Sequence, residues 1–204
     1  MKFKKVEITF FAALAVTFIC TFALARQQEN ISNKLIRLHV VAHSDGEDDQ
    51  ALKLRVRDAV LDALAAPMSG VASRSDGLRV IGDNLAAAED VALREIAASG
   101  YEYGVAALLT RENFPTRAYD TFTLPAGAYE TLRVVIGDGA GQNWWCVIYP
   151  PLCRDAVTED LGGDDADGLT EDEVRLISGG DTGAVAVRFR VLEVVAKVRQ
   201  WLGK

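Results

Sequence analysis

Apolar positions along this chain follow two periods, which predict a strand, two helices and then several further strands. Residues 36–42, IRLHVVA, are rich in β-branched side chains and are typical of a buried strand. Apolar residues then recur every three or four positions, which predicts a helix ending near Pro67 and a second helix over about 77–98. Ser44 and Glu47 form a capping-box pattern at the start of the first helix.

The middle of the chain has the pattern of a sheet. Short apolar or alternating runs at 105–109, 119–124, 129–137 and 144–149 each predict a strand. The last two runs are joined by a short glycine-rich loop, so we predict that they pair as antiparallel neighbours.

Two more helices are predicted towards the C-terminus. Thr170 and Glu173 form a capping box over a short helix, and helical spacing of apolar residues predicts another helix over about 187–202. The whole pattern predicts a single layered α/β (α+β) domain over 35–204. In it, a mostly antiparallel sheet is packed by two helices from the N-terminal half and by the C-terminal helix. An acidic, glycine-rich insertion occupies about 155–183.

The N-terminus has a separate pattern that predicts export. Three lysines lie in the first five residues, Ile8 to Ala25 is nearly all apolar, and the segment ends in a small-x-small pattern. Cleavage after Ala25 would leave a polar linker over 26–34 at the new N-terminus. An uncleaved segment 1–25 would remain as a membrane anchor, and the length of the apolar run fits both outcomes. In either case the basic start places the domain outside the cytoplasm.

Composition narrows the classes of function. The chain has 204 residues, half of them apolar, which is enough for one domain with a sizeable core. Its net charge of −7 argues against nucleic acid as a partner, because nucleic-acid binding needs a clustered basic face.

Two motifs resemble ligand-binding loops, but each lacks a feature that such a loop requires. GDGAG at 137–141 resembles a phosphate loop, but a strand-like run follows where a helix N-terminus is needed. The acidic run at 163–174 resembles a calcium loop, but Gly163 and Val174 stand where carboxylates are required. We therefore predict no cofactor and no metal.

No catalytic set stands out either. The only imidazoles are His39 and His43, which lie close to Asp45 in the sequence. On a strand, the two histidines would lie about 13 Å apart, which is too far to share a metal. A histidine at the end of a strand is expected to hydrogen-bond the chain where it turns. There is no G-x-S-x-G motif, and no spacing singles out two of the 29 acidic residues.

Cysteine and tryptophan are concentrated in one run, GQNWWCVIYPPLC at 141–153. In an exported chain, a disulfide between Cys146 and Cys153 would close the turn at Pro150 and Pro151. Two buried thiols, packed as small apolar residues, fit the spacing equally well. Neither cysteine is expected to be a catalytic nucleophile, because no histidine is near in sequence and the spacing is too wide for a C-x-x-C motif.

This run also resembles a known family. NWWCVIYPPLC, with LPAGAYETLRVVIGDGAGQ before it, is similar to the signature of stage II sporulation protein R. Residues 36–60 resemble the N-terminal block of that family, and residues 186–195 resemble its closing segment. Two features depart from the family pattern: the acidic stretch at 155–183 is longer and more polar, and His43 stands where asparagine is more usual.

The resemblance implies a non-enzymatic signal that is made in the forespore and exported into the space between the two sporangial membranes. There it is needed to activate a membrane-bound aspartic protease of the mother cell, which removes the pro-sequence of sigma-E. The residues alone leave a second hypothesis open, an exported cell-wall hydrolase that uses carboxylates the sequence does not identify. Two convergent acids in a pocket would favour the hydrolase, and an apolar patch around one tryptophan would favour the signal.

A signal that acts by contact needs an exposed anchor, and adjacent tryptophans can supply one. Side chains at neighbouring strand positions point to opposite faces, so one of Trp144 and Trp145 can enter the core while the other is exposed or covered by a helix. Burial of both fits the sequence as well. The candidate partner-contact region is Asn143, Trp144, Trp145, Tyr149, Pro150 and Pro151.

Overall fold

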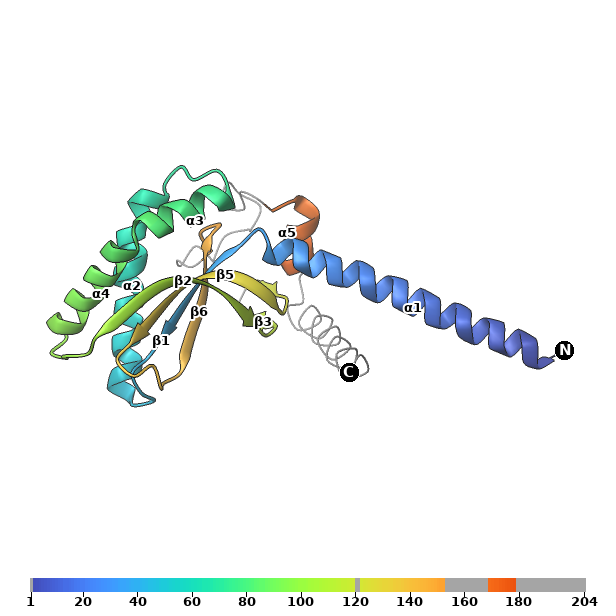
Figure 1. Cartoon of the computed structure of the whole chain (residues 1–204), viewed down its shortest axis with the longest axis horizontal. Helices are drawn as coiled ribbons and strands as arrows, with labels where there is room; N and C mark the ends of the chain where they lie inside the picture. Colours follow the sequence, from blue (N-terminus) through green and yellow to red (C-terminus); the bar gives the residue numbers. More distant parts are fainter. Residues whose placement is uncertain (1, 120–121, 153–168, 179–204) are drawn as a thin grey trace.

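The molecule consists of a mixed sheet, helices packed on the sheet, and a long N-terminal helix that extends away from it (Figure 1). The computed structural model describes residues 2–119, 122–152 and 169–178. The predicted helix at 187–202 and most of the acidic insertion at 155–183 lie outside these ranges.

The sheet has four strands in the order β2-β5-β1-β6. The strands are β1 (Ile36–Val41), β2 (Val105–Phe114), β5 (Gly127–Ile136) and β6 (Asn143–Tyr149). β1 runs parallel to β5, while the β2–β5 and β1–β6 pairs are antiparallel. The predicted fold class, helices packed on a mostly antiparallel sheet, is therefore confirmed.

The predicted pairing of the last two long strands is wrong, because β1 lies between them. β1 pairs with β5 on one side and with β6 on the other. All six of its residues are buried, as expected for a central strand that is covered on both faces. The glycine-rich loop after β5 crosses the end of β1, where Gly141 N donates to Ala42 O (3.0 Å) and Ala140 N donates to His43 O (3.1 Å).

Three helices cover the face of the sheet that we call the helix face, on which Leu38 and Val134 point into the larger core cluster. They are α2 (Glu47–Met68), α3 (Arg74–Asp83) and α4 (Leu85–Ala98). The helix predicted over 77–98 is thus two helices, because Asn84 interrupts it. Asn84 leaves the helical conformation (φ −108°, ψ 9°), and its side-chain amide donates back to Val80 O at 2.8 Å.

The opposite face of the sheet, which we call the polar face, carries Arg37, His39, Glu112, Thr131 and Arg133. Against this side pack the end of α1 (Lys2–Ser32), α5 (Glu171–Ser178) and a small ribbon of β3 (Arg117–Ala118) and β4 (Thr123–Leu124). The second core cluster consists of Ile31, Leu35, Phe114, Phe122, Leu124, Tyr129, Val147, Leu152 and Ile177. The polar side chains of β1 therefore lie between the sheet and a second layer of structure.

One of the two predicted capping boxes is confirmed and the other is wrong. At α5, Thr170 N donates to Glu173 Oε2 (2.7 Å) and Glu173 N donates to Thr170 Oγ1 (3.3 Å). At α2, the N-cap is Gly46 and no side chain caps the helix. Ser44 accepts from Gly46 N (3.1 Å) and donates to Asp49 (2.5 Å), so its hydroxyl stabilises the turn before the helix instead.

The long helix α1 is joined to the domain at its last turn. Residues 26–32, which the sequence predicts as part of a linker, continue the helix, and Ile31 and Ser32 are buried. Towards the N-terminus, large apolar side chains from Ile8 to Phe22 are exposed on the projecting helix. Within the described ranges, no helix is both long and apolar enough to cross a membrane.

Candidate functional site

Strand alternation places a row of polar side chains on the polar face of the sheet. In the parallel β1–β5 pair, Arg37 lies beside Thr131 and His39 lies beside Arg133. Arg37 and Thr131 are fully buried, and His39 is 8% exposed. Burying charged groups without partners is costly, so these side chains must find partners within the fold.

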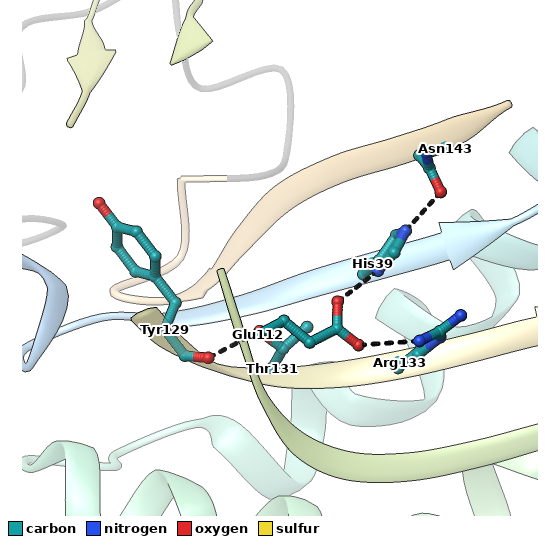
Figure 2. A network of polar contacts seen from close by, with 6 residues as sticks. All are labelled: His39, Glu112, Tyr129, Thr131, Arg133 and Asn143. Carbon is teal, nitrogen blue, oxygen red and sulfur yellow. Dashed lines mark hydrogen bonds and ion pairs between the residues drawn. The ribbon is translucent and has the colours of Figure 1, made fainter. Parts of the chain in front are cut away.

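His39 is the centre of a network that crosses the whole sheet (Figure 2). Its Nδ1 lies 2.7 Å from Glu112 Oε2 on β2, and its Nε2 lies 2.7 Å from Asn143 Oδ1 on β6. The other Glu112 oxygen accepts from Arg133 Nη1 on β5 at 3.4 Å. One residue from each of the four strands therefore contributes to this network.

The partners of His39 occupy both ring nitrogens. A carboxylate only accepts hydrogen bonds, so Nδ1 carries the hydrogen that bonds Glu112. Nε2 either donates to the Asn143 oxygen as part of an imidazolium, or accepts from the amide nitrogen of a reversed Asn143 side chain. In both cases neither nitrogen is free to bind a metal or to act as a general base.

Arg37 is the most buried charge of the site. Its Nη2 donates to the Tyr119 hydroxyl (2.5 Å), and its guanidinium lies over the rings of Phe114 (4.0 Å) and Tyr129 (5.1 Å). Burial lowers the pKa of Arg37 and raises the pKa of Tyr119. Since arginine still remains protonated, the pair is a buried cation beside a neutral hydroxyl.

Tyr129 fixes the other end of the polar face. Its hydroxyl donates to Pro125 O at 2.7 Å, and burial raises its pKa above the usual range. Thr131 Oγ1 donates to Tyr129 O at 3.1 Å (Figure 2). These bonds are local, within β5 and the turn before it, and they hold the aromatic ring against Arg37.

The two tryptophans of the candidate contact region lie on opposite faces, as the sequence predicts. Trp144 is 36% exposed and lies on the helix side, where the Arg57 guanidinium of α2 covers its ring at 4.5 Å. Trp145 lies on the polar face, edge-on to His39 (6.0 Å) and Phe114 (5.6 Å). Trp144 is therefore the tryptophan that a partner can reach.

The remaining residues of the candidate contact region differ in exposure. Asn143 and Pro151 are exposed, whereas Tyr149 and Pro150 are buried around a cis peptide bond. Pro151 lines a cavity of about 270 Å³, together with Tyr149, Ile148 and the end of α2 and its following loop. No carboxylate is among the residues that line this cavity.

The cysteines and the second histidine have structural surroundings. Cys146 is 7% exposed and disulfide-bonded, and Cys153 lies outside the described residues, so their pairing stays a prediction. His43 Nδ1 accepts from Asp138 N (3.1 Å) and its ring stacks on Tyr103 (4.1 Å), so the histidine holds the crossing loop. In the part of the chain that the structure describes, no three His, Cys, Asp or Glu side chains are placed to hold a metal ion.

Sequence reasoning identified His39 but missed its partners. Glu112 is 73 positions away along the chain, and Arg133 and Arg37 do not belong to any motif. The available signal was a charged side chain at alternate positions of an otherwise apolar strand, as Arg37 and His39 are in IRLHVVA. That pattern indicates a buried polar face, although it does not identify the partner.

Fold and site together define a single layered α/β domain with a polar network across one face of its sheet. A family model for stage II sporulation protein R matches residues 32–159, which include all strands of the sheet and every residue of the network. The chain belongs to the stage II sporulation protein R family.

One curated relative supports this assignment. Stage II sporulation protein R of Bacillus subtilis (strain 168) is 35% identical over 133 residues, which is 63% of this chain. The match spans 59% of the length of that relative. No solved structure matches the chain.

Proposed function

We propose that this protein is an exported sporulation signal that activates a membrane-bound aspartic protease of the mother cell, which then processes pro-sigma-E. The observation that carries the proposal is the family match over residues 32–159, together with an N-terminal sequence typical of an export signal. The signal is made in the forespore and acts in the space between the two sporangial membranes.

A contact mechanism agrees with the geometry of β6. Trp144 is a partly exposed aromatic residue with the cation of Arg57 over its ring, whereas the Asn143 side chain points to the polar face and bonds His39. Tryptophan and arginine are the side chains that most often dominate the energy of protein interfaces. The surface of Trp144 and Arg57, which we call the β6 surface, is therefore the proposed contact for the protease.

No observation on the described residues favours the alternative, a cell-wall hydrolase. Such an enzyme needs two carboxylates that face the scissile bond. The cavity beside Pro151 has no carboxylate in its lining, and Glu112 is the one carboxylate in the network of the polar face, where it is bonded to His39 and Arg133.

Reconstitution in a bacterium that does not sporulate tests the proposal. The protein, the protease and pro-sigma-E are expressed together, and an immunoblot follows conversion of the precursor. We expect conversion only when all three are present and the protein retains residues 1–25, because the contact must form outside the cytoplasm. Conversion without this protein, or none with it present and exported, would overturn the proposal.

A further inference from the structure

The polar face holds more positive than negative charge. Arg37 lies over the Phe114 ring at 4.0 Å, Arg117 lies over the Trp145 ring at 5.8 Å, and Arg133 pairs with Glu112 on the same face. Glu112 is the one carboxylate bonded into the described network, and it is shared by Arg133 and His39. This surplus is local, because the whole chain has a net charge of −7.

Arg37 has donors that no acceptor satisfies. Its side chain is fully buried, and among the described residues its Nη2 bonds Tyr119 while Nε and Nη1 have no hydrogen-bond partner. The rings of Phe114 and Tyr129 offset part of the desolvation cost through cation–π contact, but a ring supplies no acceptor in the plane of the guanidinium. A buried cation in this state is strongly destabilised unless an anion reaches it.

A second buried donor lies beside the same ring. Trp145 Nε1 is buried and likewise has no acceptor among the described residues. The Trp145 ring contacts Phe114 at 5.6 Å, and the Arg37 guanidinium lies 4.0 Å over that same Phe114 ring. Three buried donor nitrogens without an acceptor, two on Arg37 and one on Trp145, thus belong to side chains that contact the same Phe114 ring.

We propose that Arg37 and Trp145 form a binding site for a carboxylate group. A carboxylate carries one charge, which matches the single buried guanidinium of Arg37, and its two oxygens fit the planar donor fork of arginine. The walls of the site are Phe114, Tyr129 and the Trp145 ring, which suit a singly charged group better than a strongly hydrated phosphate. The site does not depend on the protease proposed above.

The carboxylate is supplied by another molecule, as an acidic side chain or the C-terminus of a bound peptide. Acetate and a short glutamate peptide carry the same group, so both serve as probes of the site.

Nuclear magnetic resonance of the full-length protein tests the site. The indole N–H signals of the three tryptophans are recorded, and Trp145 is assigned with Trp145→Phe. Sodium acetate and a capped Gly-Glu-Gly peptide are titrated, with sodium chloride and capped Gly-Gln-Gly as controls. We expect a saturable shift of the Trp145 signal with acetate and the glutamate peptide, and none with the controls.

Two arginine variants show whether the shift depends on the site. Arg37→Met should abolish it, whereas Arg111→Met should retain it, because Arg111 is half-exposed and pairs with Glu130 at the sheet edge. Where Arg37→Met does not fold, Arg37→Lys keeps the charge without the fork, and acetate affinity should then fall at least about tenfold.

The outcomes separate a built site from chance binding. A saturable response that depends on Arg37 supports the carboxylate site. The proposal is overturned if the wild type shows no response that depends on Arg37, or if sodium chloride gives the same shift, which would mean an adventitious ion only.

Discussion

Glu112 is the single residue on which most of the polar network depends. Its two oxygens bond His39 at 2.7 Å and Arg133 at 3.4 Å, and its side chain is only 17% exposed. This largely buried carboxylate bonds two basic side chains, His39 and Arg133. Removing its charge leaves both groups with weaker acceptors.

We therefore expect Glu112→Gln to lower the free energy of unfolding by about 2 kcal/mol. The matched control is Arg111→Gln on the same strand, which breaks an exposed 3.8 Å pair with Glu130. That change should cost less than about 1 kcal/mol, because exposed ion pairs contribute little. Urea denaturation at neutral pH measures both, and equal losses would contradict the assigned importance of Glu112.

At the scale of elements, α5 is attached to the domain by an ion pair. Lys34 Nζ lies 2.6 Å from Glu173 Oε2, which also accepts from Thr170. Burial alone would raise the pKa of Glu173, but the bonds from Lys34 and Thr170 outweigh it and lower the pKa below its ordinary value of 4.5. A carboxyl group whose folded pKa is lowered stabilises the fold above its unfolded pKa.

The wild type should therefore be more stable than Glu173→Gln by about 0.5–1 kcal/mol near neutral pH. This difference should persist down to about pH 4.5 and disappear as the pH falls further, through the lowered pKa of the folded state. Urea denaturation at several pH values measures it. A difference that grows on acidification would show that the pKa of Glu173 is raised instead.

The loop that crosses β1 has a steric requirement. A Cβ at Gly141 would lie 2.1 Å from Ser44 O, a backbone atom that no side-chain movement can clear. We expect Gly141→Ala to destabilise the fold by about 2 kcal/mol or more, because the loop must leave the end of β1. Thermal unfolding measures the loss.

Gly104→Ala is the matched control, because a Cβ there meets nothing within 4 Å. It should leave the melting temperature nearly unchanged. If the two alanine variants have the same melting temperature, the crossing loop does not pack against Ser44 as described.

Local signals in the sequence predicted the elements, whereas contacts distant along the chain decided their arrangement. The capping box of Thr170 and Glu173 lies within four residues, and the structure confirms it. The position of β1 between β5 and β6 depends on pairs about 100 residues apart, and the glycine loop alone wrongly predicted a hairpin. His39 shows the same limit, because a buried histidine can be predicted from its strand but Glu112 as its partner cannot.

At the scale of the whole molecule, we propose that export places the domain outside the cytoplasm. The lysine-rich start and the apolar run to Ala25 predict that a reporter enzyme fused after residue 60, of a kind that is active only outside the cytoplasm, will be active. Sequencing the N-terminus of the mature protein should give a start near Arg26. A reporter that is inactive in this fusion would contradict export.

The central claim is that the protein signals by contact through the β6 surface, and paired tryptophan variants test it most directly. Trp145 packs between His39 and Phe114, so Trp145→Ala should lower the free energy of unfolding by about 3 kcal/mol. Trp144 is partly exposed, so Trp144→Ala should cost less than about 1 kcal/mol.

The measurement is the conversion of pro-sigma-E by the co-expressed protease, followed by immunoblot. The Trp144→Ala variant is compared with the wild type at equal protein levels, and the melting temperature of the variant is determined in parallel. The account predicts a variant that folds and is exported but leaves the precursor unprocessed, because its interface anchor is missing. Full processing by a folded Trp144→Ala variant would contradict the account and show that the protein signals through another surface.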